Sequence, residues 1–497
     1  MFQKLIDLFV KNYDSITNRT VVTVLFITSF FIRFPFFFRD YIDRDESTFI
    51  LMGQSWVDGY LPYTQLWDLK PPVIFLFFAT IIYSFGKSFI AIRFFGAVIV
   101  ALTAFFTYKI GETTHSKKIG LWAAIACVLL LSLFGSLQGV MSEHICMLFF
   151  LPALYLVIKY IRPWAFLCAG LLLGLSLMSK LNIAYVILVL CLNLLYSFFN
   201  TNQFWKGLTN ILLLGLGIIS ITLSTFLPYY FQDLTDVWWN SVIMAPIEYS
   251  ASHQNPIYKT APFCIIILTF LVLIWKQKLL NFSNRGVSIL MATVFGEILM
   301  FTMGGKVNGH YLIQFYPVFI VLFFMVIAQL EIVRNKSNFL LKYLPFLLFL
   351  IPIESYIEYA NILKSKWEQG TFYNGEGIRA PNYILQNNLE TKNILFLEYH
   401  IGYWVLDETP LTVAATHPSN ILRESLFPYF NNPRKTGLEE IRYIMETIKP
   451  QTVVIRKNKK VFDKKYKEAN LYINHYLESR YKLTATVGNA KIHQRLE

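Results

Sequence analysis

The chain contains few cysteines, and their positions exclude a disulfide framework. Its 497 residues include five cysteines, all within apolar segments and none after residue 264. No Cys-x-x-Cys pair occurs among them. The sequence therefore predicts that they are small core residues. They are Cys127, Cys146, Cys168, Cys191 and Cys264.

Charged residues are also scarce, at 15% of the chain, whereas 55% of the residues are hydrophobic. This balance is typical of a protein with many membrane spans. The scarcity is uneven, because residues 1–359 carry 24 Lys/Arg and 17 Asp/Glu, whereas the shorter stretch 360–497 carries 20 and 14. The sequence thus predicts a membrane domain at 1–359 and a globular C-terminal domain at 360–497, which is long enough for its own core.

The chain has no dense basic run with interleaved aromatics, although its net charge is +13. A nucleic-acid partner is therefore excluded, and the basic excess is better explained by orientation in a membrane. Residues 1–20 are polar and lack a small-residue cleavage site, so we expect the first span to be retained.

Apolar segments of about 17–25 residues predict an α-helical polytopic membrane protein of about 11–13 spans, followed by a small α/β soluble domain. Eleven such segments can be placed. They are 21–38, 89–109, 119–137, 144–160, 163–180, 183–199, 208–228, 261–275, 287–303, 310–329 and 339–357.

Segment 72–86 is apolar but short, and two prolines, Pro71 and Pro72, stand at its start. Such a segment is more often interfacial or re-entrant than spanning. If it does not span, 15 basic residues of the loops fall on one side of the membrane and seven on the other. The positive-inside rule then predicts a cytoplasmic N-terminus and an extracytoplasmic C-terminal domain.

The first outer loop carries an acidic pair, Asp45-Glu46, and later Lys70-Pro71-Pro72. Ionisable groups at one membrane surface are a functional hypothesis by default. A carboxylate here can act as a general base toward a hydroxyl, and a lysine suits a phosphate as a point charge. The alternatives are a helix N-terminal signature for the acids and a snorkelling role for the lysine.

Further ionisable residues are predicted on the same face. Glu143 opens a span, Lys180 ends an apolar run, and Lys306, His310 and Tyr311 lie in a Gly-rich loop that suits an anionic head group. Helix-terminal stabilisation of the acid and snorkelling of the lysine are the alternatives. No metal-binding spacing occurs, so a divalent metal is left open.

The loop 229–260 is aromatic and polar, with Trp238, Trp239 and Glu248 as candidate contacts to a sugar or an acceptor. Aromatic faces stack on sugar rings, but Trp and Tyr also crowd membrane interfaces, so both interpretations stand.

The C-terminal domain alternates strand-like and helix-like runs. We expect strands at 393–399 and 452–457, helices at 437–450 and 464–480, and a hairpin or strand pair at 481–495. No phosphate loop or catalytic triad signature occurs there, so an accessory role, such as binding the acceptor, is expected.

Taken in order, these motifs resemble the GT-C glycosyltransferase superfamily. The branch is that of the protein O-mannosyltransferases, the lipid A aminoarabinose transferases and the related bacterial uronosyltransferases. The resemblance covers roughly residues 20–330. Its matching positions are Asp45-Glu46, Lys70-Pro71, Glu143, Lys180 and the stretch from Lys306 to Pro317. The chain departs from the family in having Glu rather than the frequent Asp at 143, and Leu181 rather than glycine after Lys180.

The resemblance implies a mechanism. A polyprenyl-phosphate sugar enters from the bilayer, and Lys70, Lys180 and Lys306 hold its phosphate. Asp45 deprotonates an acceptor hydroxyl, which attacks the anomeric carbon in one displacement, with inversion. The acceptor is a glycan, a lipid or a protein, and the expected location is the inner membrane of a bacterium, with an extracytoplasmic active site.

Two other functions are compatible with the sequence. A GT-C enzyme acting as a glycan ligase or polymerase would use a glycan chain as the donor. A non-enzymatic transporter of lipid-linked sugars would also bind a lipid phosphate with basic groups, but it predicts internal repeats and charges near span centres, which the sequence lacks.

Overall fold

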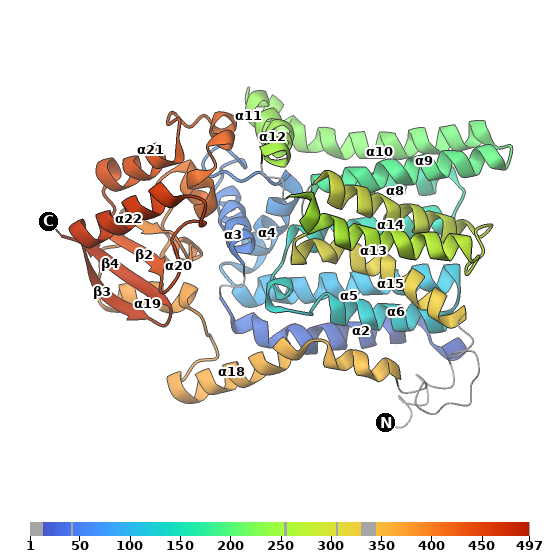
Figure 1. Ribbon diagram of the computed structural model, residues 1–497, viewed down its shortest axis with the longest axis horizontal. Helices are drawn as coiled ribbons and strands as arrows, with labels where there is room; N and C mark the ends of the chain where they lie inside the picture. Colours follow the sequence, from blue (N-terminus) through green and yellow to red (C-terminus); the bar gives the residue numbers. More distant parts are fainter. Residues whose placement is uncertain (1–12, 41–42, 253–255, 305–306, 330–343, 497) are drawn as a thin grey trace. The chain divides into compact units, whose positions relative to one another are not determined.

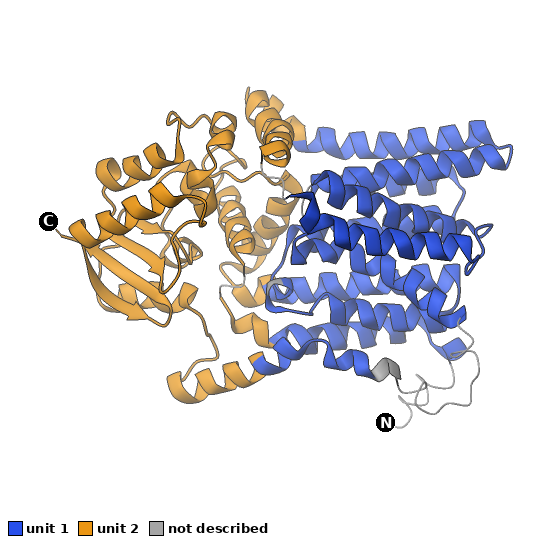
Figure 2. Cartoon of the chain, in the orientation of Figure 1, with its two compact units in different colours: residues 1–34, 93–225, 253–357 blue, residues 35–92, 226–252, 358–497 orange. Residues whose placement is uncertain are grey.

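The computed structural model describes residues 13–40, 43–252, 256–304, 307–329 and 344–496. The chain forms two compact units, each built from separate stretches (Figures 1 and 2). The first contains residues 1–34, 93–225 and 253–357, and the second contains 35–92, 226–252 and 358–497. The C-terminal stretch therefore folds into one unit with two earlier stretches of the chain.

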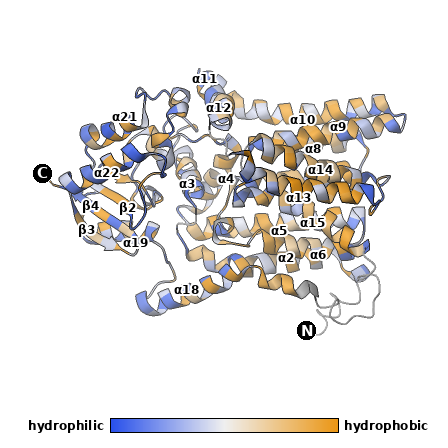
Figure 3. Ribbon diagram, viewed as in Figure 1, coloured by the Kyte–Doolittle hydropathy of each residue, from blue (hydrophilic) through white to orange (hydrophobic). Residues whose placement is uncertain are grey.

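The first unit is built of long apolar helices. Figure 3 shows hydrophobic residues along these helices, as expected where lipid and neighbouring helices are the surroundings. Its helices are α2 (Asn18–Arg33), α5 (Phe89–Thr114), α6 (Lys117–Leu130), α7 (Ser142–Lys159), α8 (Pro163–Leu177), α9 (Ala184–Asn200), α10 (Phe204–Tyr230), α13 (Ile257–Lys276), α14 (Arg285–Met303), α15 (Leu312–Gln329) and α18 (Ile353–Gln369). Of these, α5, α10 and α18 continue into stretches of the second unit.

Among the described residues, eight helical stretches are long and apolar enough to cross a membrane, so the chain is an integral multi-pass membrane protein. They correspond to eight of the eleven expected spans. In the other three, the helices differ from the expected ranges. Segment 119–137 forms α6 up to Leu130 and a short 3₁₀ helix at Gly135–Gln138, and 163–180 forms α8 up to Leu177, because turns end both α-helices early. Of segment 339–357, residues 339–343 lie outside the described residues, and the described part has a short 3₁₀ helix at Leu344–Leu350 and then begins α18 after Pro352.

Close backbone contact joins α8 and α10. Gly170 and Gly174 are spaced four residues apart on α8, which is the spacing of small residues that lets membrane helices approach. A Cβ atom added to Gly170 would lie 2.1 Å from the carbonyl oxygen of Leu214, and one added to Gly217 would lie 2.5 Å from the nitrogen of Leu171. The two helices therefore pack too closely for larger side chains at these glycines.

The second unit contains the short segment 72–86, which forms α4 (Pro72–Phe85). Pro72 occupies the first turn, where a missing N–H costs nothing, and Gly86 ends the helix with a φ of 67°. At 14 residues α4 is shorter than the membrane-crossing helices. It packs against α3 (Arg44–Val57). Its interfacial orientation stays a prediction.

The second unit also contains a four-stranded sheet in the order β1-β2-β4-β3, together with further helices. The strands β1 and β2 are parallel, and the other pairs are antiparallel. The elements are α11 (Thr235–Trp239), α12 (Ala245–Ser252), α19 (Glu376–Gln386), α20 (Gly402–Leu406), α21 (Gly437–Arg442), α22 (Lys467–Arg480), β1 (Ile394–Phe396), β2 (Thr452–Arg456), β3 (Tyr481–Val487) and β4 (Ala490–Arg495).

The strand and helix patterns expected in the C-terminal stretch are confirmed. Strands β1 and β2 lie within 393–399 and 452–457, and β3 and β4 form the expected hairpin. Apolar residues of β1, β2, α21 and α22 form one core, with Leu395, Val453, Ile441 and Ile473 fully buried. A small α/β fold therefore accompanies the helical membrane fold.

Candidate active site

The N-terminus of α3 presents the acidic pair. Asp43 caps the helix, and its side chain accepts a hydrogen bond of 2.9 Å from the backbone N–H of Asp45. This places Asp45 and Glu46 in the first turn, where the helix dipole favours negative charge. Glu46 is buried, whereas the Asp45 side chain is 28% exposed. Of the pair, Asp45 is the carboxylate accessible to a reactant.

Lys70 lies next to Asp45. Its ammonium is 3.6 Å from Asp45 Oδ2 and 5.8 Å from the centre of the Phe49 ring. Its backbone carbonyl accepts a 2.6 Å hydrogen bond from the Tyr63 hydroxyl, and Pro71 follows with a φ of −65°. The hydroxyl and the proline fix the backbone, so the lysine points at the carboxylate.

A histidine from the C-terminal stretch contacts the other oxygen of the carboxylate. His417 Nε2 lies 3.3 Å from Asp45 Oδ1. The backbone N–H of Ser419 donates to His417 Nδ1 over 3.1 Å, so Nδ1 has no proton and Nε2 carries it. Burial lowers the pKa of His417, more than the hydrogen bond to Asp45 raises it. A neutral imidazole thus donates to Asp45 and orients it.

Two more contacts hold α3 against the C-terminal stretch, and a third joins the first outer loop to another part of the unit. The Thr48 hydroxyl is 2.9 Å from His400 Nε2, and Arg44 forms an ion pair with the buried Glu398. The Trp67 indole N–H donates to Ser241 Oγ over 2.9 Å, which joins the first outer loop to the aromatic loop. These contacts link the three stretches of the second unit around Asp45.

Sequence reasoning missed His417. No motif marks it, because its partner lies more than 370 positions earlier and the segment around it, Thr416-His417-Pro418, has the composition of an ordinary turn. Only the fold brings the histidine to the carboxylate.

The first unit holds a second group of charged residues. Glu143 lies in the first turn of α7 and is fully buried, with Oε1 2.6 Å from the ammonium of Lys180. Ser142 donates to Glu143 Oε2 over 3.0 Å. Burying a carboxylate is costly unless it is paired, so this arrangement explains why Glu143 and Lys180 occur together.

His310 and Tyr311 complete this group. His310 Nε2 is 4.0 Å from Glu143 Oε1, and the Lys180 ammonium lies 4.7 Å from the centre of the Tyr311 ring. The structure therefore brings Glu143, Lys180, His310 and Tyr311 together, a set that can bind an anion with two basic groups. Lys306 lies outside the described residues.

Arg33 supports this group and was also missed by sequence reasoning. It is buried at the end of α2, and its guanidinium donates to the carbonyl groups of Leu137, Gln138 and Gly139 over 2.7–3.1 Å. These residues form the loop before α7. Arg33 thereby fixes the segment that positions Glu143. A lone arginine in an apolar helix was the available signal.

The aromatic candidates differ in exposure. Trp238 is buried and packs edge-on against Phe226, with ring centres 5.3 Å apart, whereas Trp239 is 53% exposed. Glu248 lies half-buried on α12. Only Trp239 of this pair presents a ring surface for stacking.

The candidate residues fall into two groups, one in each unit. Asp45 and Lys70 belong to the second unit, and Glu143, Lys180, His310 and Tyr311 to the first. Throughout the described ranges, no cluster of three or more His, Cys, Asp or Glu residues suits a metal ion.

Comparison with known proteins gives two kinds of similarity. The family model described as dolichyl-phosphate-mannose-protein mannosyltransferase matches residues 69–229, which include Lys70, Glu143 and Lys180. No curated protein sequence matches the chain.

Among solved structures, the chain is similar to ArnT from Cupriavidus metallidurans bound to undecaprenyl phosphate. The TM-score is 0.62 at 10% identity, over 96% of this chain and 97% of that one. It is also similar to the apo oligosaccharyltransferase of Archaeoglobus fulgidus, with a TM-score of 0.50 at 10% identity, over 90% of this chain and 70% of that one. The family model therefore matches the middle of the membrane part, and the two structures show that the chain shares its fold with membrane glycosyltransferases.

Proposed function

We propose that the protein transfers a sugar from a polyprenyl-phosphate donor to an acceptor hydroxyl, with inversion, at the extracytoplasmic face of the bacterial inner membrane. The observation that carries the proposal is the Asp45 carboxylate, held between Lys70 and His417 at the N-terminus of α3. The similar proteins support a polyprenyl-phosphate donor, since the matched family is described as using dolichyl-phosphate mannose and the ArnT structure contains undecaprenyl phosphate.

Asp45 would act as the general base. An acceptor hydroxyl gives its proton to the carboxylate while its oxygen attacks the anomeric carbon of the donor sugar. The bond between that carbon and the phosphate oxygen breaks, and the electron pair leaves with the polyprenyl phosphate. A single displacement of this kind inverts the anomeric centre.

His417 and Lys70 have different tasks in this mechanism. His417 keeps one carboxylate oxygen oriented by donating from Nε2, so the other oxygen is directed to the reactant. Lys70 stabilises the carboxylate and would also bind the phosphate of the donor next to the reacting groups.

Lys180 and His310 would bind the phosphate of the donor. The Lys180 side chain is buried, and Glu143 and Tyr311 hold its ammonium in one place. A fixed cation stabilises the charge that develops on the leaving phosphate more than a mobile one does. In this proposal Glu143 is a positioning residue for Lys180 and not the base.

The basic residues of the loops support the proposed face. With α4 at the interface, 15 of them fall on one side and seven on the other, which orients the membrane domain with its N-terminus in the cytoplasm. Asp45, Lys180 and the C-terminal stretch are then extracytoplasmic.

The experiment compares bacterial cells that lack the protein with the same cells producing the wild type or Asp45→Asn. Mass spectrometry measures the lipid-linked sugars and the surface glycans. We expect cells without the protein, and cells with Asp45→Asn, to accumulate a lipid-linked sugar and to lose one glycan product. Restoration of that product by Asp45→Asn would mean that Asp45 is not the base. A lipid-linked chain of several sugars, in place of one sugar, would identify a ligase or polymerase.

A further inference from the structure

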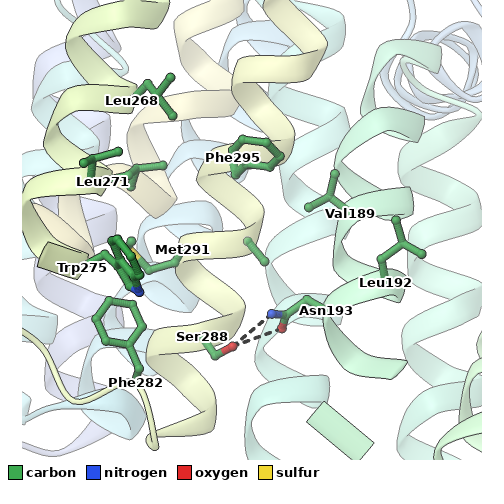
Figure 4. A pocket seen from close by; sticks show the side chains of 12 residues that line it. Val189, Leu192, Asn193, Leu268, Leu271, Trp275, Phe282, Ser288, Met291 and Phe295 are labelled. Carbon is green, nitrogen blue, oxygen red and sulfur yellow. Dashed lines mark hydrogen bonds between the residues drawn. The ribbon is translucent and has the colours of Figure 1, made fainter. Parts of the chain in front are cut away.

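Two hollows adjoin one another on the first unit. The first is an apolar groove with a volume of about 420 Å³, formed by α9, α13 and α14 (Figure 4). Leu268, Leu271, Met291 and Phe295 line it. Its walls belong to helices that are long and apolar enough to cross a membrane, and several lining side chains are exposed. The groove therefore opens to the hydrocarbon of the bilayer.

The polar groups of the groove wall satisfy each other. Asn193 donates to Ser288 Oγ over 3.0 Å, as Figure 4 shows. Because the amide and the hydroxyl are hydrogen-bonded to each other, the groove suits an apolar occupant better than one with hydrogen-bond donors or acceptors.

The second hollow, of about 760 Å³, shares Trp275 and Phe282 with the groove. It is lined further by Lys276 and Lys278 and by the amide side chains of Asn281 and Gln329. No carboxylate occurs in this lining, and neither ammonium forms an ion pair with the part of the chain that the structure describes. This hollow is therefore positively charged, with a tryptophan at its border with the groove.

The two hollows lie away from the candidate phosphate site of the same unit. Lys180 directly precedes the segment that begins α9, and Asn193 lies 13 residues further along the chain. At 1.5 Å per helical residue, that separation is about 20 Å along the helix axis. A donor whose phosphate binds at Lys180 therefore does not place it between Lys276 and Lys278.

We propose that these hollows form a binding site for one anionic phospholipid. An acyl chain occupies the groove, and the phosphate of the head group contacts Lys276 and Lys278. An anionic lipid fits better than a zwitterionic one, because the lining offers two cations and no carboxylate to a choline or an amine. The site is independent of the proposed sugar transfer.

Native mass spectrometry of the full-length, delipidated protein tests this. Phosphatidylglycerol and phosphatidylcholine with identical acyl chains are titrated separately. We expect the anionic lipid to bind about tenfold more tightly, and Lys276→Gln with Lys278→Gln to remove that difference while leaving phosphatidylcholine unchanged. Ala292→Phe, which fills the groove, should weaken both lipids. Raising the salt concentration should weaken only the anionic lipid.

Lys206→Gln is the matched control, because Trp205-Lys206 is another exposed Trp-Lys pair, at the start of α10. It should bind both lipids as the wild type does. Equal affinities of the wild type for both lipids would overturn the proposal, as would an equal loss in the control variant. Displacement of phosphatidylglycerol by equimolar undecaprenyl phosphate would also overturn it, in favour of a second site for the donor carrier. Since both lysines are exposed, their variants are expected to fold.

Discussion

A carboxylate that takes a proton in a reaction must be fixed and must stay accessible. Asp45 meets both conditions. Asp43 fixes the helix turn that carries it, His417 and Lys70 hold its two oxygens, and the side chain is still 28% exposed. Glu46, one residue further, is buried and is not equivalent. The roles of the two acids therefore differ because of their position on one helix turn.

We predict that Asp45→Asn lowers sugar transfer by roughly 10²–10⁴-fold, the usual loss on removing a general base, with donor binding retained. The assay is transfer by the purified protein, with titration of polyprenyl phosphate measured in parallel. Asp58→Asn, at the exposed end of the same helix, is the control and should be active. Near-normal transfer by Asp45→Asn would exclude this residue as the base.

The second prediction concerns pH. Because the pKa of His417 is lowered in the folded protein, the unfolded chain binds this proton more readily. The free energy of unfolding should therefore be at its full value above the ordinary pKa of about 6.5 and fall as the pH decreases below it. Each such histidine can contribute at most about 1.4 kcal/mol per pH unit. His400, whose pKa burial also lowers, acts in the same direction.

Unfolding measured at a series of pH values should show a weaker pH dependence in His417→Gln than in the wild type. The titratable and charged groups that face His417 are Asp45, Asp68, Arg423 and His400. All four are kept in the variant, so that only the imidazole of residue 417 differs from the wild type. The exposed His475→Gln should behave as the wild type. An unchanged pH profile in His417→Gln would mean that its protonation is not linked to folding.

At the scale of elements, helices α8 and α10 show that an apolar pattern predicts a helix but not the face with which it packs. Both helices are uniformly apolar, so their sequences predict membrane helices without naming the contact face. Glycines decide it. Gly170 and Gly217 allow backbone atoms of the two helices into contact, where a Cβ atom has no space.

We predict that Gly170→Val destabilises the first unit by about 1–3 kcal/mol or more, because the helices must separate. The matched control is Gly215→Ala on α10, since a Cβ atom there meets nothing within 4 Å. Thermal unfolding of the purified protein in detergent measures both. Equal stability of the two variants would contradict the close packing of α8 against α10.

At the scale of the whole molecule, the chain divides its candidate site residues between two compact units. Lys70 is in one unit with Asp45, and Lys180 is in the other with Glu143. The contribution of each lysine to binding of the donor phosphate can be measured separately.

We predict that Lys70→Ala and Lys180→Ala each weaken binding of polyprenyl phosphate about tenfold or more, since a charge-assisted contact contributes roughly 1.5–3 kcal/mol. The double variant should depart from additivity, because both lysines would contact one anion. Removing Lys180 alone leaves Glu143 buried without its partner, so Lys180→Met with Glu143→Gln is the control. Unchanged affinity in both single variants would refute a shared phosphate site.

The last prediction is the orientation of the chain. We expect His115→Cys, before α6, to be labelled from the cytoplasm, and Ser479→Cys, in α22, from the outside, because both residues are exposed. The parent for both variants lacks the native cysteines, of which Cys168 is exposed. With a cytoplasmic N-terminus, labelling of His115→Cys from the outside and of Ser479→Cys from the cytoplasm would mean that α4 spans the membrane, because a further span before both positions would exchange their sides.

The sequence by itself determined the parts of this protein that depend on local composition and spacing. Long apolar runs specify helices, since only internally bonded backbone is stable in lipid, and eight of the eleven expected spans follow from that rule. Alternating apolar residues specify β2 and the β3–β4 hairpin. Ionisable residues next to apolar runs, such as Asp45, Lys70, Glu143 and Lys180, are conspicuous because placing charge there is costly.

Only the tertiary structure decided which of these groups meet. Glu143 pairs with Lys180 and Asp45 with Lys70, but the sequence does not encode either pairing by spacing. His417 reaches Asp45, and Arg33 reaches the loop before α7, through contacts between segments far apart in the chain. Long-range contacts of this kind depend on how helices and strands pack, and packing is a property of the complete set of surfaces and not of any one segment.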